Sequence, residues 1–271
     1  MTGSSILRKA WQGRWALVTG ASAGIGEALA VELAAAGVNL VITARRKDRL
    51  DALKARLTST FKIEVQVLVS DLEDPAAPKQ IFDATEGQGT TVDLLVNNAG
   101  FGAYGEFASR ELDRHLAMVQ VNCSAVLHLT HLFLQKMNER RRGDVLIVAS
   151  TASFQPVAYI SSYAATKAFD RFLAEGLAEE ERRYGVRVSA LCPGPTESEF
   201  FAQAGDQKPK GPKPQQASIV ARRGLEGLAR GKAWVIPYLG GRAQTFVQRL
   251  TPRRFVNALT ARMFRPEELK R

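Results

Sequence analysis

The stretch "RWALVTGASAGIG", residues 14–26, places a short apolar run directly before three closely spaced glycines. The run at 14–18 has the composition of a buried strand, and a helical pattern covers 24–36. Gly20, Gly24 and Gly26 let backbone approach a ligand closely, and the start of the helix offers N–H groups and a positive dipole end. Glycines also serve tight packing, but directly after the first strand of a βαβ unit they predict a dinucleotide site.

The rest of the chain repeats this alternation of strand and helix. Seven β-rich apolar runs, several without polar alternation, read as strands at 14–18, 39–43, 64–69, 92–96, 144–149, 186–191 and 233–236. Helical patterns fill the gaps at 24–36, 47–58, 74–86, 111–140, 161–184 and 217–230. Strands that are apolar throughout are covered on both faces, so the pattern predicts an α/β protein with a doubly wound, seven-stranded parallel sheet.

Two late segments depart from this rhythm. The first, "GDQKPKGPKP" at 205–214, has the composition of a loop, and we expect a mobile substrate lid at about 198–216. The second, 240–271, reads as a basic amphipathic helix or helix pair interrupted at Pro252. We therefore expect one Rossmann-type domain over 1–239 followed by a C-terminal basic helical extension.

Charge and cysteine content narrow the possible functions. The 271 residues carry a net charge of +10, much of it late in the chain, which is typical of a solvated face. The aromatic residues of the tail follow an apolar stripe instead of interleaving as stacking platforms, which disfavours nucleic-acid binding. Cys123 and Cys192 fit a reducing compartment without disulfides. With neither a signal peptide nor an apolar run long enough to cross a bilayer, we expect a cytoplasmic protein.

The second strand ends in "VITARRKDRL", which bears on the choice of cofactor. An NAD site usually has an acidic residue here, but Ala44 is neutral and Arg45 and Arg46 follow. A guanidinium group binds a 2′-phosphate through charge-assisted hydrogen bonds. We favour Arg45 as the phosphate ligand, whereas Arg46 equally fits the start of a solvated helix. The prediction is NADP(H) in preference to NAD(H).

Six motifs occur in the order and spacing of the short-chain dehydrogenase/reductase family, which this sequence resembles from about residue 13 to 238. They are "TGASAGIG" (19–26), "VNNAG" (96–100), Asn122, Ser150, "YAATK" (163–167) and "PGPTESEF" (193–200). The resemblance implies a single Rossmann domain, oxidoreductase activity and a homodimer or homotetramer.

The resemblance also implies a set of cofactor-binding residues. The glycine-rich turn contributes its backbone, Asp71 and Leu72 hold the adenine, and Asn98 to Gly100 line the ribose side. Pro193 and Gly194 shape the nicotinamide pocket, with Thr196 and Ser198 beside it; the family often has threonine where Ser198 stands. The full expected set is Gly20, Ser22, Ala23, Gly24, Ile25, Gly26, Arg45, Arg46, Asp71, Leu72, Asn98, Ala99, Gly100, Tyr163, Lys167, Pro193, Gly194, Thr196 and Ser198.

The catalytic set that the resemblance implies is Asn122, Ser150, Tyr163 and Lys167. Carbonyl reduction needs a proton for the developing alkoxide, and a free tyrosine with a pKa of about 10 exchanges protons poorly at neutral pH. Lys167, one helical turn from Tyr163, and the positive nicotinamide would lower that pKa. Ser150 can hydrogen-bond the substrate oxygen. We expect Asn122 to kink its long helix and to hold a water that leads protons to Lys167.

The predicted pocket residues indicate the class of substrate. The pocket segment "TASFQPVAYISS" (151–162), Phe101, Phe200 and Phe201 are mostly apolar, so we expect an apolar ketone, aldehyde or 3-oxoacyl group. No metal site is expected, because the three histidines lie along one helix without a second ligand cluster. A non-catalytic NADP sensor or scaffold is the alternative, and a peripheral membrane contact through the basic tail is a minority interpretation.

Overall fold

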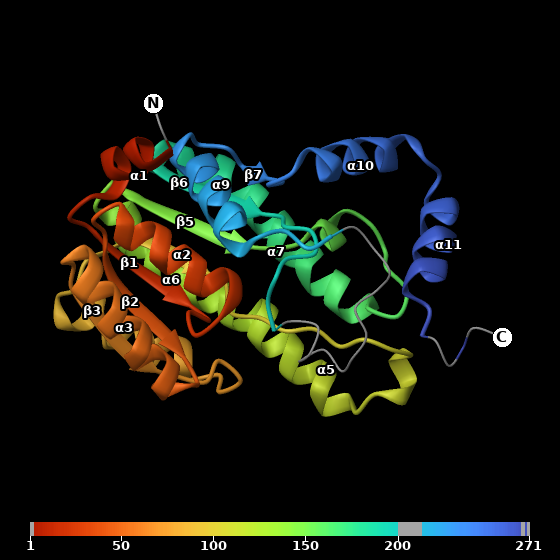
Figure 1. Cartoon of the computed structure of the whole chain (residues 1–271), viewed down its shortest axis with the longest axis horizontal. Helices are drawn as coiled ribbons and strands as arrows, with labels where there is room; N and C mark the ends of the chain where they lie inside the picture. The colour runs from red at the N-terminus through yellow and green to blue at the C-terminus, as the bar shows by residue number, and fades with distance from the viewer. Residues whose placement is uncertain (1–2, 200–212, 267–268, 270–271) are drawn as a thin grey trace.

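The computed structural model describes residues 3–199, 213–266 and 269 (Figure 1). Its seven strands form one parallel sheet in the order β3-β2-β1-β4-β5-β6-β7. The strands are β1 Trp15–Thr19, β2 Asn39–Ala44, β3 Val65–Val69, β4 Val92–Asn97, β5 Gly143–Val148, β6 Val186–Leu191 and β7 Trp234–Val235. The chain runs outward from β1 to β3 and then returns to β4 beside β1. This reversal opens a crevice at the carboxyl ends of β1 and β4, and the predicted fold class is confirmed.

Helices cover both faces of the sheet, as Figure 1 shows. The helices are α1 Gly3–Trp11, α2 Gly24–Ala35, α3 Lys47–Phe61, α4 Ala77–Asp83, α5 Leu112–Val119, α6 Ala125–Glu139, α7 Ser161–Glu180, α9 Ala217–Ala229, α10 Leu239–Leu250 and α11 Arg253–Phe264. Short 3₁₀ turns stand at Glu86–Gln88, Phe107–Ser109, Thr151–Phe154 and Glu181–Tyr184.

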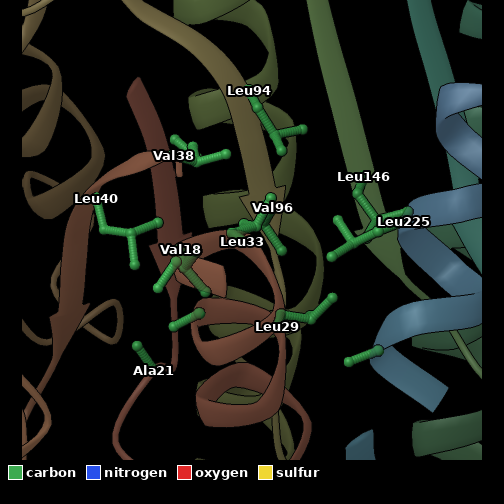
Figure 2. Packing of buried hydrophobic residues seen from close by; sticks show 14 of the residues in the cluster. Val18, Ala21, Leu29, Leu33, Val38, Leu40, Leu94, Val96, Leu146 and Leu225 are labelled. Atoms are coloured by element: carbon green, nitrogen blue, oxygen red, sulfur yellow. The ribbon is translucent and has the colours of Figure 1, made fainter. Parts of the chain in front are cut away.

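Two apolar layers hold the sheet, one on each face. In the first, Leu29 and Leu33 of α2 pack between Val18 and Val96, while Leu225 of α9 faces Leu146 (Figure 2). The second layer contains the alternate strand residues together with α4, α6 and α7. Both faces of the central strands are buried, which explains why these strands show no polar alternation in the sequence.

The N-terminal helix α1 was not predicted. Its Trp11 is fully buried, and the indole Nε1 donates a hydrogen bond to Asp144 Oδ2 over 2.7 Å. The helix has nine residues and is therefore shorter than the window of about 11–18 residues over which helical periodicity is read, so the sequence did not reveal it. The contact joins the start of the chain to the amino end of β5.

The predicted long helix at 111–140 consists of α5, a π-helical segment at Gln120–Ser124 and α6. Among the described residues, Leu112–Glu139 is the one helix long and apolar enough by composition to cross a membrane, contrary to the expectation that no segment is. Its buried residues, including Met118, Leu129 and Phe133, belong to the second core layer. Packing against the sheet therefore accounts for the buried apolar face of this helix, while Leu112, Leu116, Val119 and Leu127 remain exposed.

The predicted C-terminal helix pair is present as α10 and α11, with Pro252 between them. The pair extends away from the sheet beyond α7 (Figure 1). It contacts the body through Tyr104 Oη, which donates to Phe264 O over 3.0 Å, and Thr260 Oγ1, which donates to Pro156 O over 3.4 Å. Most of the expected lid, residues 200–212 including Phe200 and Phe201, lies outside the described residues.

Candidate active site

The glycine-rich turn lies at the carboxyl end of β1 and is braced by the loop after β4. Gly20 and Gly24 have positive φ angles of 66° and 59°, which only glycine adopts without strain. Asn98 Nδ2 donates to Thr19 O over 2.9 Å, and Thr19 Oγ1 accepts from the backbone N–H of both Asn98 and Ala99. Backbone N–H groups at the start of α2 thus border an open cavity.

A cluster of charged side chains lies on the outer side of this turn. Arg46 donates to Ser22 Oγ from Nε and Nη2, at 3.2 and 3.0 Å, and its Nη1 lies 2.7 Å from Glu199 Oε2. Arg49 contacts the same carboxylate, and the hydrogen bonds from Arg46 and Arg49 lower the pKa of Glu199 to about 2. Two guanidinium groups therefore meet beside the glycine turn.

Arg45 takes a different direction from Arg46. Its side chain is 59% exposed and pairs with Glu73 at 3.0 Å and Asp71 at 3.8 Å. Arg46, which fitted a solvated helix start in the sequence, is instead 35% exposed and tied to the turn. Both arginines line the cavity, and Arg46 is the one held against the glycine turn; which of the two binds a phosphate remains a prediction.

Ser150 and Tyr163 meet at the carboxyl end of β5. Ser150 caps the turn at Thr151–Phe154, and its Oγ accepts from Ala152 N over 3.1 Å. Tyr163 lies in the first turn of α7, and its hydroxyl is hydrogen-bonded to the Ser150 side chain. The pair presents two hydroxyl groups to the cavity.

The electrostatics of Tyr163 differ from the expectation in one respect. Burial raises the pKa of Tyr163, while Lys167 and the Ser150 hydrogen bond lower it and Asp170 raises it further. Lys167 acts in the predicted direction, but burial outweighs it in the cofactor-free chain, so the net pKa is above the ordinary value. The expected lowering by the positive nicotinamide stays a prediction.

Asn122 lies in the π-helical segment and is completely buried. Its Oδ1 accepts from Phe101 N over 3.1 Å, and its Nδ2 donates to Phe101 O and to Thr166 Oγ1 at 2.9 and 3.0 Å. The predicted irregularity of the helix is thus present. The side chain joins the loop after β4 to α7, while its proposed water remains a prediction.

The chain after β6 borders the cavity that Ser150 and Tyr163 line. Thr151 N donates to Pro193 O over 2.8 Å, which fixes the expected nicotinamide segment against the Ser150 turn. A Cβ on Gly194 would lie 2.6 Å from Tyr238 Oη, and a Cβ on Gly24 would lie 3.0 Å from Ser198 Cβ. The segment therefore passes directly over the glycine turn, with the ring of Tyr238 against Gly194.

One cavity of about 1150 Å³ joins these groups. Every residue of the predicted catalytic and cofactor-binding sets lines it except Asn122, which lies behind the lining residues. The sequence did not reveal three parts of the site. Tyr238 and the helix pair α10–α11 line the cavity, and Asp170 is paired with the lining residue Lys167. None carries a local motif, although the apolar stripe of the tail was a signal that it covers a surface.

Comparison with known proteins gives consistent results. The family profile described as short chain dehydrogenase matches residues 14–209. A very-long-chain 3-oxoacyl-CoA reductase of Bos taurus is 34% identical over 189 residues, which are 68% of this chain and 59% of that protein. This chain thus spans about six-tenths of the length of that curated relative.

Two solved structures are also similar. A short-chain dehydrogenase from Sphingobium yanoikuyae in complex with NADPH superposes with a TM-score of 0.80 at 30% identity, covering 88% of this chain and 93% of that one. A bulky-bulky ketone specific alcohol dehydrogenase from Comamonas testosteroni gives a TM-score of 0.76 at 28% identity, with coverage of 88% and 92%.

Proposed function

Because the chain belongs to the short-chain dehydrogenase/reductase family, we propose that it is an NADP(H)-dependent oxidoreductase that interconverts a carbonyl group and an alcohol on a largely apolar substrate. The observation that carries the proposal is the hydrogen-bonded pair of Tyr163 and Ser150, which lines the same cavity as Lys167 and the glycine turn. A sensor or scaffold would not require these acid–base groups at the cavity wall.

The residues around the cavity fit a dinucleotide. Gly20, Gly24 and the start of α2 would hold a pyrophosphate, and Arg46 with Ser22 would hold a 2′-phosphate. Asp71 and Leu72 border that end, and Pro193 and Gly194 the other. When bound, NADPH supplies the hydride.

The protein's own groups handle the proton. Tyr163 gives its hydroxyl proton to the alkoxide that forms during reduction, and accepts a proton in the reverse direction. Ser150 donates a hydrogen bond to the same oxygen as its negative charge develops. The ammonium group of Lys167 stabilises the phenolate that remains, because opposite charges favour each other in a site with little water.

The substrate side of the cavity is apolar on the wall that α10 and α11 supply. The described lining residues from these helices carry no ionisable group; they are Ala243, Val247, Gln248, Thr251, Phe255, Val256, Leu259, Thr260, Met263 and Phe264. Such a wall favours an uncharged hydrocarbon tail or ring system beyond the carbonyl. The C-terminal helices are thereby proposed as part of the substrate site.

A substrate panel tests this function. With NADPH, 3-oxoacyl thioesters or methyl ketones of increasing chain length should show kcat/KM rising about fourfold per added CH₂ until the cavity is filled, since each buried CH₂ contributes about 0.8 kcal/mol. Phe255→Asp should flatten this rise, whereas Phe246→Asp, an exposed α10 residue outside the cavity lining, should not. Efficient turnover of small charged ketoacids alone would contradict the apolar site.

A second copy of the chain is the proposed protein partner. Large apolar side chains are exposed on α5, α6 and α7, and α5 contacts α7. These residues are Leu112, Leu116, Val119, Leu127, Phe169 and Phe172. Contiguous exposed apolar surface of this kind typically marks a site of protein–protein interaction. The homodimer or homotetramer remains a prediction.

The outer side of the helix pair supports a further candidate, a lipid-associated dehydrogenase. Leu239, Phe246 and Leu250 are exposed on α10, at 77%, 65% and 75%. Exposed arginines accompany them at 242, 253, 254, 262 and 265, and the sequence from 240 to 266 contains no Asp or Glu. Apolar residues flanked by arginines bind anionic lipid surfaces, each cation contributing about 1 kcal/mol near the membrane.

Vesicle flotation tests this membrane contact. The full chain should float with vesicles that contain phosphatidylserine and should remain in solution with pure phosphatidylcholine. Phe246→Glu combined with Arg253→Glu should abolish flotation without lowering NADPH oxidation, because neither residue lines the cavity. As a control, Arg56→Glu alters an exposed arginine on α3 and should leave flotation unchanged. Equal flotation of all variants would retire the membrane interpretation.

A further inference from the structure

Asp170 is a buried carboxylate that belongs to none of the recognised motifs. It lies three residues after Lys167 on α7, has no exposed surface, and places Oδ2 2.8 Å from Lys167 Nζ. Its second oxygen, Oδ1, is also buried and has no hydrogen-bond partner in the described part of the chain. Burying an incompletely hydrogen-bonded carboxylate destabilises the folded protein. Its presence therefore suggests that it has a function.

The contacts of Lys167 show what the carboxylate does. Nζ donates to Asp170 Oδ2 and to Val148 O, both at 2.8 Å. An ammonium group has three N–H bonds, so one remains for the cavity that Lys167 lines. Gly100 lies against the same atom, since a Cβ there would be 3.4 Å from Nζ. Asp170 and Val148 therefore hold the ammonium at one position behind Tyr163.

The charges around this pair act in opposite directions. Burial lowers the pKa of Lys167, whereas Asp170 and then Tyr163 raise it, and the net pKa lies above the ordinary value. Burial raises the pKa of Asp170 to about 6 against the opposing effect of Lys167. Two cysteines lie near the pair, Cys123 of the π-helical segment and Cys192 after β6; burial raises the pKa of each thiol to about 12, so both stay neutral.

We propose that Asp170 is a positioning residue for the catalytic centre: it is the counter-ion that keeps buried Lys167 charged and holds its Nζ where it stabilises the Tyr163 phenolate. The inference rests on the proposed function for its kinetic consequence. Its electrostatic part concerns only residues of this chain. Without the carboxylate, burial would favour the neutral amine, and Tyr163 would lose the positive charge that opposes its own burial.

A titration of Tyr163 in the cofactor-free protein tests the electrostatic part. The ultraviolet absorbance of phenolate is followed with pH in the wild type and in Asp170→Asn, and the same variants carrying Tyr163→Phe are subtracted. Asp170→Asn should raise the pKa of Tyr163 by about one unit, because loss of the lysine charge outweighs loss of the carboxylate. A Tyr163 pKa that is unchanged or lower would overturn the proposal.

Two controls keep the result interpretable. Asp144→Asn removes another buried carboxylate, paired with Arg187 on β6, and should change stability without moving the Tyr163 titration. Asp170→Ser removes the charge from a smaller side chain and should give the same shift, so it serves if the asparagine variant is insoluble.

Kinetics provides the second measurement. The rate of reduction by wild type should change little between about pH 7 and 9, where Asp170 is charged, whereas the rate of Asp170→Asn should fall about tenfold per pH unit above the lowered lysine pKa. A purely structural role would scale the whole profile without changing its shape, and that result would overturn the proposal. If the wild type reduced no carbonyl but the titration shifted as expected, the proposed function would fail and the role of Asp170 would stand.

Discussion

Replacing Tyr163 by phenylalanine is expected to lower kcat for carbonyl reduction by about 10²- to 10⁴-fold, while the Kd for NADPH changes by less than about threefold. The substitution removes only the hydroxyl group that is hydrogen-bonded to Ser150. Ser150 keeps its bond to Ala152 N, so the turn after β5 retains its geometry. The loss therefore measures proton transfer and not folding.

The matched control is Tyr184→Phe, which removes a tyrosine hydroxyl beside β6 and outside the cavity lining. Stopped-flow oxidation of NADPH with a saturating ketone gives kcat, and quenching of protein fluorescence gives the Kd. Wild-type turnover by Tyr163→Phe would show that another group supplies the proton. Tyr238, whose ring lies against Gly194, would then be the next candidate.

The parts of the site that the sequence predicts most directly are those whose residues lie close together along the chain. The glycine turn follows its strand directly, and Tyr163 and Lys167 are one helical turn apart, so local spacing fixes their relative positions. Ser150 was named by the resemblance to the family, and its place after a predicted parallel strand agreed, because such strands bring their carboxyl ends to one edge. These residues were located without knowledge of any contact between distant segments.

The remainder depends on packing between distant segments. Asp170 has the same helical spacing as many surface carboxylates, and only its burial beneath β5 makes it a counter-ion. Tyr238 reaches Gly194 from the far end of β7, and α11 reaches the cavity through contacts with residues 104 and 156. Helical periodicity revealed an apolar face on α11 but not what that face covers.

Cofactor choice is the second property with a large expected effect. Arg46→Ser should raise KM for NADPH about 10- to 100-fold and change KM for NADH less than about twofold, because a charge-assisted hydrogen bond contributes about 1.5–3 kcal/mol. The reason lies in Arg46 being held beside Ser22 at the edge of the cavity, where a 2′-phosphate would meet it. Initial rates with each cofactor measure the ratio.

Arg45 and Arg56 supply the comparison that decides between the two arginines. Arg45→Ser should raise KM for NADPH less than Arg46→Ser does, since Arg45 is more exposed and only Arg46 is hydrogen-bonded to Ser22 of the glycine turn. Arg56→Ser alters an exposed arginine paired with Glu27 and should change neither cofactor's KM. If Arg45→Ser has the larger effect, the phosphate lies at the end of β2, as the sequence first indicated. Arg46 would then serve chiefly to hold Glu199 beside the turn.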